Sequence, residues 1–173
     1  TAQAYRDQGN WRIFYEQGLA RVAAEIRDDR VVRLIQFQHN AGGAVASSDV
    51  YELGQPQPVL DTLESYYSIA RGRITARDAE RVSRIFMRAG AVAGSVDLNK
   101  DGLVNRIHSE KAGLRDSYQL GAERALMDNF NFYWNAASDR PVFSDAVLSA
   151  RAWLTGEGSV RGSAQLNASG LVT

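Results

Sequence analysis

The sequence contains no cysteine, which excludes disulfides, thiolate metal sites and a cysteine nucleophile. It also has no run of about 18 apolar residues, the length that a membrane-spanning helix requires. Twenty basic and twenty acidic residues cancel, so no net charge favours nucleic acid or an anionic membrane. We therefore expect no nucleic-acid partner and no transmembrane segment in this chain.

The remaining composition is that of an ordinary globular protein. Its 173 residues suit one domain, and a hydrophobic content of 45% supplies a sizeable core. The chain opens at Thr1 without a Met, which suggests processing or truncation and the removal of a signal or anchor segment. These features favour a periplasmic or extracellular protein.

Hydrophobic periodicity predicts a helix near the N-terminus. Residues 9–28 carry a set of apolar side chains at helical spacing: Trp11, Phe14, Tyr15, Leu19, Val22, Ala23 and Ile26. The alternative is a β-meander, because alternate residues from 20 to 26 are also apolar and Gly18 costs a helix interior about 1 kcal/mol. Both readings stay open at this point.

The next segment reads as β structure. Residues 31–37 form a short apolar run that ends at Asn40-Ala41-Gly42-Gly43, and residues 45–53 are its expected antiparallel partner. Further helices are predicted over residues 58–69, 75–89, 109–134 and 144–154, from apolar spacing and from capping residues such as Thr75 and Ser144.

Together these patterns predict an α+β fold, namely a mostly helical single domain over residues 1–173. Residues 1–54 supply the amphipathic helix and a small antiparallel β element in the N-terminal third. Residues 58–155 form the helical part, and the Gly- and Ser-rich tail 156–173 is either an edge strand or loosely ordered.

The most specific motif is Asp-Leu-Asn-Lys-Asp-Gly-Leu-Val-Asn, residues 97–105. Oxygen ligands at loop positions 1, 3 and 5, a Gly at 6, an aliphatic residue at 8 and a polar residue at 9 are what a calcium loop requires. Position 12, where a bidentate Glu is usual, falls on His108, and the nearest carboxylate downstream is Glu110. The predicted ligands are Asp97, Asn99, Asp101, the backbone carbonyl of Leu103, Asn105 and Glu110.

This motif resembles the calcium loops of EF-hand and dockerin proteins. Residues 97–102 are also similar to the calcium loop of bacterial periplasmic galactose-binding proteins, in which a distant Glu supplies the bidentate ligand. The resemblance covers about nine residues and implies calcium as a cofactor, but no sugar-binding function. The alternative is a metal-free turn, since Asn, Asp and Gly favour turn geometry by themselves.

Weaker echoes of the loop suggest a repeat. Residues 72–78 fit loop positions 6, 8, 9 and 12, which would pair Ile74 with Val104, and residues 139–143 form a third, more degenerate match. The alternative is that these two weak matches to the loop arise by chance.

Other candidate sites have simpler explanations. Phe130, Phe132, Tyr133 and Trp134 could form a stacking platform for sugars or a partner's anchor, but core packing is the favoured interpretation. A pair of carboxylates could cleave a glycosidic bond, but solvated faces with Arg partners are the favoured interpretation of such residues. The carboxylates in question are Glu64, Asp78, Glu80, Glu110, Asp116 and Glu123.

No catalytic residue is assigned. The sequence lacks a Gly-x-Ser-x-Gly elbow, a phosphate loop and a His-Glu-x-x-His motif. We therefore predict a calcium-stabilised protein–protein interaction module of an exported bacterial protein, with an unidentified protein partner. The alternative is a small glycan or peptidoglycan hydrolase that uses paired carboxylates and a structural calcium.

Overall fold

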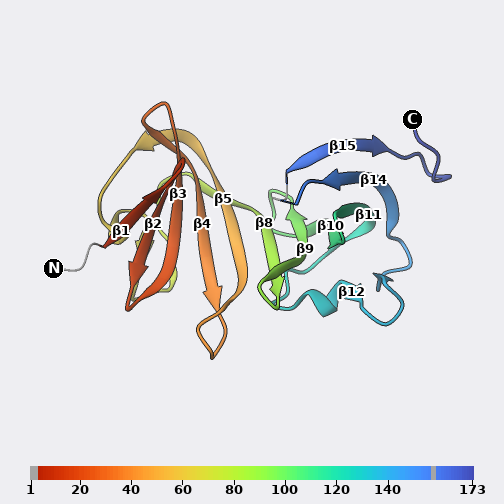
Figure 1. Ribbon diagram of the computed structural model, residues 1–173, viewed down its shortest axis with the longest axis horizontal. Helices are drawn as coiled ribbons and strands as arrows, with labels where there is room; N and C mark the ends of the chain where they lie inside the picture. The colour runs from red at the N-terminus through yellow and green to blue at the C-terminus, as the bar shows by residue number, and fades with distance from the viewer. Residues whose placement is uncertain (1–3, 157–158) are drawn as a thin grey trace. The chain divides into compact units, whose positions relative to one another are not determined.

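The structure, a computed structural model, describes residues 4–156 and 159–173, and strands dominate it (Figure 1). The predicted mostly helical α+β fold is therefore wrong. Among the described residues the helical segments are two short 3-10 turns, η1 (Leu63–Ser65) and η2 (Phe130–Phe132). The strands are β1 (Tyr5–Gln8), β2 (Trp11–Glu16), β3 (Leu19–Arg27), β4 (Arg30–His39), β5 (Val45–Pro58), β6 (Tyr67–Ser68), β7 (Arg73–Ile74), β8 (Ala79–Arg88), β9 (Ala91–Leu98), β10 (Val104–Lys111), β11 (Leu114–Arg124), β12 (Trp134–Asn135), β13 (Arg140–Pro141), β14 (Val147–Leu154) and β15 (Val160–Gln165).

The chain divides into two compact units, unit 1 (Thr1–Ser83) and unit 2 (Arg84–Thr173). Each is an antiparallel meander in which long strands pair in chain order. The pairing runs from β1 to β5 in unit 1 and from β9 through β10, β11 and β14 to β15 in unit 2. Each unit has an apolar core of its own.

Two-residue turns explain why residues 9–28 form strands rather than a helix. Gln17 and Gly18 have φ angles of 52° and 78°, so they form the tight reversal that joins β2 to β3. A turn with two positive φ angles matches the twist of an antiparallel hairpin and favours Gly at its second position. The β-meander alternative for this segment is confirmed.

Bulges explain why strand residues mimic helical spacing. Val31 and Leu34 lie three residues apart, yet both are fully buried on one strand. In the pairing of β3 with β4, the neighbours Glu25 and Ile26 pair with Arg33 and Val31, so β4 has one extra residue at this point and both side chains return to the same face. A bulge thus converts the two-residue period of a strand into a three-residue spacing that is typical of a helix.

In each unit a long connection, here called a flap, carries a 3-10 turn and a short hairpin. Flap 1 spans residues 59–78 and contains η1, β6 and β7, while flap 2 spans residues 126–145 and contains η2, β12 and β13. Each flap buries one tyrosine against a phenylalanine of the meander. The ring centroids of Tyr66 and Phe14 are 5.6 Å apart, and those of Tyr133 and Phe86 are 6.1 Å apart.

The two flaps are held by the same hydrogen bonds. The Tyr66 hydroxyl donates to the Pro58 carbonyl at 3.0 Å and accepts from the Leu60 amide at 2.8 Å. In unit 2 the Tyr133 hydroxyl donates to the Ala125 carbonyl and accepts from the Met127 amide, both at 2.6 Å. The tyrosine, the backbone amide and the backbone carbonyl of unit 1 each have their counterpart in unit 2, 67 residues later in the sequence.

Matching residues extend along both units, which identifies them as two repeats of one design. The matched pairs include Arg12 and Arg84, Phe14 and Phe86, Gly18 and Gly90, Arg33 and Arg106, Asp49 and Asp116, Tyr51 and Tyr118, Gly54 and Gly121, Asp61 and Asp128, and Asp78 and Asp145. Even a turn contact is repeated, because Gly54 donates to the Asp78 carbonyl as Gly121 donates to the Asp145 carbonyl. This repeat differs from the one that the calcium-loop echoes suggested.

Candidate functional site

The predicted calcium loop is a tight hairpin turn between β9 and β10. Asn99 Oδ1 accepts hydrogen bonds from the backbone amides of Asp101 at 2.9 Å and Leu103 at 3.0 Å. The Asn99 amide donates to the Leu103 carbonyl at 2.9 Å, so the side chain and the backbone of one residue close the turn. Strands rather than helices therefore flank this loop, unlike the loop of an EF-hand.

The same turn occurs twice more, without carboxylates. Asn40 Oδ1 accepts from the amides of Gly42 and Ala44 at 2.9 and 3.1 Å. Asn167 Oδ1 accepts from the amides of Ser169 and Leu171 at 2.9 and 3.0 Å. Because these two turns have no acidic residue at the equivalent positions, the hydrogen bonds of the Asn side chain account for the geometry by themselves.

The other predicted ligands have protein partners of their own. Asp97 Oδ2 lies 2.8 Å from His108 Nε2 across the β9–β10 pair. The Asn105 carbonyl accepts from Gln119 Nε2 at 3.0 Å. Glu110 lies at the far end of β10, where Arg115 Nε donates to it at 2.8 Å. The structure thus gathers the ligands between residues 97 and 105 on one hairpin and separates Glu110 from them.

The described ranges contain no group of three or more His, Asp or Glu side chains arranged to hold a metal ion. The expectation that helices flank this loop is wrong, because the loop is an Asn-closed turn between two strands. Whether calcium binds there stays a prediction.

Thermal melts in excess calcium and in excess chelator check that prediction. If an ion is held, Asp101→Ala should lower the melting temperature in calcium and leave it nearly unchanged in chelator, because a ligand of the folded state alone stabilises it. Asp101 suits this test because its neighbour Asn99, not its own carboxylate, closes the turn. An equal loss in both solutions would contradict calcium binding.

Two of the carboxylates considered for catalysis are neutralised by arginines. Arg151 donates to both oxygens of Asp116, at 2.7 and 3.0 Å. Arg115 donates through Nε and Nη2 to a single oxygen of Glu110, Oε1. Both carboxylates are therefore already engaged by charged hydrogen-bond donors. The arrangement does not favour hydrolysis of a glycosidic bond at these two residues.

Unit 2 carries two adjoining hollows beside Trp134. Their volumes are about 370 and 310 Å³. Both are lined by Ser109 and Lys111 of β10, by Trp134 at the start of β12, and by Asp139 of flap 2. Lys111 Nζ lies 3.1 Å from an Asp139 carboxylate oxygen, so an ion pair links the sheet to the flap at the rim.

Neighbouring aromatic rings fix the Trp134 indole. Phe130 stacks parallel to it, with centroids 6.1 Å apart and planes 9° apart. Tyr118 meets it edge-on at 5.7 Å. Burial raises the pKa of Tyr118, so its hydroxyl stays protonated near neutral pH. The ring is therefore a rigid, partly exposed wall shared by both hollows.

Unit 1 has larger side chains at two of the equivalent positions. Gln36 occupies the place of Ser109, because each pairs with the matched residue across the strands, Val22 in unit 1 and Gly94 in unit 2. Gln36 Nε2 donates to the Gly72 carbonyl of flap 1 at 2.9 Å.

One position further along, unit 1 has Arg21 where unit 2 has Ala93. Arg21 lies 3.6 Å from Glu16 in an ion pair. The hollows of unit 2 thus lie beside two positions at which unit 1 has long polar side chains and unit 2 has short ones.

The aromatic cluster predicted from the sequence is divided by the structure. Phe130 and Tyr133 are buried, as core packing requires, whereas Phe132 is 52% exposed and Trp134 lines the hollows. Sequence reasoning missed Ser109 and considered Asp139 only as part of a degenerate match to the calcium loop. The signal for them was the duplication, visible in the recurrence of Arg-Ile-Phe at residues 12–14 and 84–86.

Helices of the length and hydrophobicity that a membrane span needs do not occur in the part of the chain that the structure describes. Comparisons of the chain with protein-family models, with curated proteins and with solved structures found no match.

Proposed function

We propose that this protein is a non-enzymatic binding module that recognises an uncharged saccharide at the hollows beside Trp134. The observation that carries the proposal is the difference between the repeats. Unit 2 has Ala93 and Ser109 where unit 1 has Arg21 and Gln36. The two short side chains line a concavity of about 370 Å³. This volume is within the usual range of small-molecule sites, about 300 to 1,000 Å³.

The balance of charge around the hollows favours an uncharged ligand. Arg88 and Lys111 face the larger hollow together with Glu110 and Asp139. Two positive and two negative side chains give no net field there, which disfavours a phosphate or a polycation. Hydroxyl groups both donate and accept hydrogen bonds, so a polyhydroxylated ligand can use ammonium, guanidinium and carboxylate groups at once.

The aromatic wall supplies the apolar part of the site. A sugar ring presents C–H groups on its faces, and a flat indole such as that of Trp134 offers a complementary apolar surface. The rigid setting of Trp134 between Phe130 and Tyr118 lowers the entropic cost of binding, since the ring is already ordered.

Binding rather than hydrolysis follows from the state of the carboxylates. Asp116 lines the smaller hollow and Glu110 the larger one, and both are already bonded to arginines. We therefore propose that the site binds a saccharide and does not cleave it.

Restoring the unit 1 residues tests this proposal. The double variant Ala93→Arg/Ser109→Gln should fill the hollows and weaken saccharide binding at least about tenfold, a loss equivalent to about 1.4 kcal/mol. The measurement is a screen of neutral oligosaccharides by glycan array, followed by titration calorimetry of each hit with both proteins.

Gln36→Ser in unit 1 is the matched control, because it makes the reciprocal exchange away from the hollows and should leave binding unchanged. Absence of any neutral saccharide ligand, or equal affinity of the filled variant, would overturn the proposed function.

A further inference from the structure

Three polar side chains of unit 2, here called the triad (Asp97, His108 and Ser117), form a hydrogen-bonded chain. His108 Nε2 lies 2.8 Å from Asp97 Oδ2, and His108 Nδ1 lies 2.6 Å from Ser117 Oγ. A carboxylate only accepts hydrogen bonds, so Nε2 donates its proton to Asp97, and in that tautomer Nδ1 accepts from the Ser117 hydroxyl. The order of groups is that of a Ser-His-Asp triad, with the two ring nitrogens exchanged.

Neighbouring strands bring the triad together on one face of the sheet. Asp97 lies on β9, His108 on β10 and Ser117 on β11, and His108 pairs directly with Ser117. On β10, Ile107 belongs to the core and Ser109 lines the hollows. His108 lies between them and therefore points to the other face, because strand residues alternate. The triad is thus separate from the proposed saccharide site.

Unit 1 shows that the sheet does not require polar residues at these positions. Ile35 holds the place of His108 and Val50 that of Ser117, and these two residues are also directly paired. An apolar cross-strand pair in one repeat is therefore a His–Ser pair in the other. Both repeats form the same antiparallel meander, so the fold by itself does not account for the His–Ser pair.

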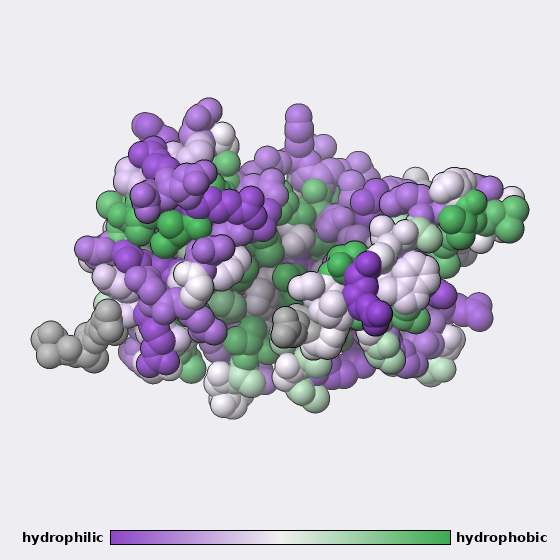
Figure 2. All heavy atoms as spheres, turned by 45° about the horizontal axis from the view of Figure 1, so that its top comes forward, coloured by the Kyte–Doolittle hydropathy of each residue, from purple (hydrophilic) through white to green (hydrophobic). Residues whose placement is uncertain are grey.

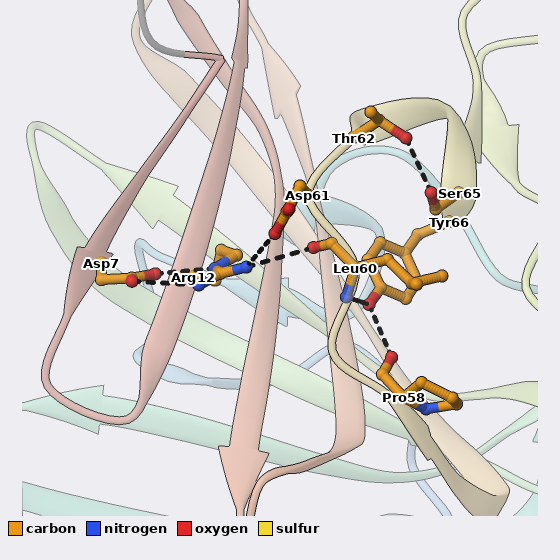
Figure 3. A network of polar contacts seen from close by, with 8 residues as sticks. All are labelled: Asp7, Arg12, Pro58, Leu60, Asp61, Thr62, Ser65 and Tyr66. Carbon is orange, nitrogen blue, oxygen red and sulfur yellow. Dashed lines mark hydrogen bonds and ion pairs between the residues drawn. The ribbon is translucent and has the colours of Figure 1, made fainter.

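A network with a structural role has a different placement. In Figure 3, Arg12 Nη1 donates to Asp61 Oδ1 at 2.8 Å, and the Tyr66 hydroxyl donates to the Pro58 carbonyl at 3.0 Å. These bonds attach flap 1, which lies outside the meander. The triad instead links three strands that are already paired through their backbones. Its hydrogen bonds are available for chemistry.

Solvent reaches the triad. The His108 side chain is 15% exposed, that of Asp97 is 37% exposed, and Ser117 is partly exposed as well. Figure 2 shows hydrophilic side chains over much of the surface in view, so polarity alone does not mark a site. The distinguishing feature here is a serine hydroxyl held 2.6 Å from an imidazole nitrogen whose ring a carboxylate orients.

We propose that Ser117 is an acylation site, at which an activated ester transfers its acyl group to the serine hydroxyl. Ser117 Oγ attacks the ester carbonyl carbon, and its proton moves to His108 Nδ1. Asp97 orients the ring and stabilises the imidazolium that forms. The bond from the carbonyl carbon to the leaving oxygen then breaks, and Nδ1 gives the proton to that oxygen. The products are O-acylated Ser117 and an alcohol.

A guanidinium beside the triad would stabilise the developing negative charge. Arg106 lies two residues before His108, its Nη1 is 3.9 Å from Asp97 Oδ2, and its Nη2 donates to Gln119 Oε1 at 3.3 Å. Positive charge at this position favours the oxyanion of the tetrahedral intermediate. The transfer is separate from saccharide binding, so either proposal can fail without the other.

An alkyl fluorophosphonate tests the activation of Ser117, because an activated hydroxyl displaces fluoride and stays bonded to phosphorus. The full chain is treated in excess chelator, so that no metal ion competes for Asp97, and peptide mass spectrometry locates the adduct. Ser117 should be labelled at least about a hundredfold faster than Ser95, since general-base assistance is worth about 10² to 10⁴. Ser95 is the matched comparison because it pairs with His108 from the other side.

Acyl transfer itself is measured as the initial release of nitrophenolate from 4-nitrophenyl acetate. The double variant His108→Ile/Ser117→Val carries the unit 1 residues at both positions, so it should fold and should release nitrophenolate at least about tenfold more slowly. Prior treatment of the unaltered protein with the fluorophosphonate should give the same low rate. Ser95→Ala should react like the unaltered protein.

The role of Asp97 is tested by the same labelling rate. Asp97→Asn should slow labelling of Ser117 at least about tenfold in protein whose circular dichroism spectrum is unchanged, because an amide does not stabilise the imidazolium. A purely structural role of Asp97 would leave the labelling rate of the folded variant unaltered.

Two outcomes would overturn the proposal: labelling of Ser117 no faster than that of Ser95, or release of nitrophenolate by the double variant at the rate of the unaltered protein. The first outcome would mean that His108 is only a hydrogen-bond partner of Ser117. If the double variant fails to fold, the ratio of the two labelling rates in the unaltered protein still decides the question.

Discussion

Alanine in place of Gly94 is expected to lower the free energy of unfolding of unit 2 by about 3 kcal/mol, the upper end of the usual range for overpacking. A Cβ atom at Gly94 would lie 2.2 Å from Phe130 Cζ and 2.6 Å from the His108 carbonyl oxygen. Phe130 packs against both Phe86 and Trp134, so its ring has little room to move. Urea unfolding followed by circular dichroism measures the loss.

The matched control is Gly162→Ala on β15, where a new Cβ would meet no atom within 4 Å. This variant should lie within about 0.5 kcal/mol of the unaltered protein. If Gly94→Ala is equally mild, the close approach between β9 and flap 2 is not a feature of the folded protein.

Unit 1 suggests a compensating change. Val22 holds the position of Gly94, and it packs in the same core as Leu63, which holds the position of Phe130. In unit 1, a larger residue on the strand is thus combined with a smaller residue on the flap. The double variant Gly94→Val/Phe130→Leu should therefore be more stable than Gly94→Val alone, and a double-mutant cycle measures this coupling.

Part of the fold was predictable from the sequence. The expected strands over residues 31–37 and 45–53 are confirmed as β4 and β5, because a short β-branched run bounded by Asn and Gly has few other solutions. The edge-strand alternative for the tail is confirmed over residues 160–165 by β15.

The predicted helices failed for local reasons. In residues 75–89, Ile85 and Phe86 are adjacent and apolar. Two adjacent apolar residues fit one side of a helix, whereas in a strand they lie on opposite faces. In the structure Phe86 faces the core of unit 2 and belongs to β8. A strand with hydrophobic residues on both faces loses the alternation on which strand prediction depends.

The candidate site was less predictable because it depends on a comparison between repeats. Ser109 and Ala93 are ordinary residues by themselves. They stand out only when they are compared with Gln36 and Arg21 at the matched positions of unit 1. The number of residues between matched positions also changes along the chain, from 72 to 73 and then to 67, because turns and loops differ in length. A search for a fixed period around the Asp97 loop could not detect such a pattern.

Removal of the hydroxyl group of Tyr133 is expected to reduce stability nearly as much as the substitution Gly94→Ala. Tyr133→Phe should lower the free energy of unfolding by about 2 kcal/mol, because it leaves the Ala125 carbonyl and the Met127 amide without their shared partner. The side chain is 1% exposed, so water cannot easily replace the hydroxyl. Burial raises the pKa of Tyr133, which keeps the hydroxyl protonated and able to donate at neutral pH.

Tyr66→Phe should have an effect of the same size, since the Tyr66 hydroxyl bridges Pro58 and Leu60 in the same manner. Tyr15→Phe is the control, because Tyr15 lies on β2 outside both flaps and should lose less than about 0.5 kcal/mol. Urea unfolding of all three variants gives the comparison. Equal, large losses for Tyr66 and Tyr133 would mean that each unit depends on its own flap for stability. Small losses for both would mean that the two hydrogen bonds of the tyrosine hydroxyl contribute little to holding each flap.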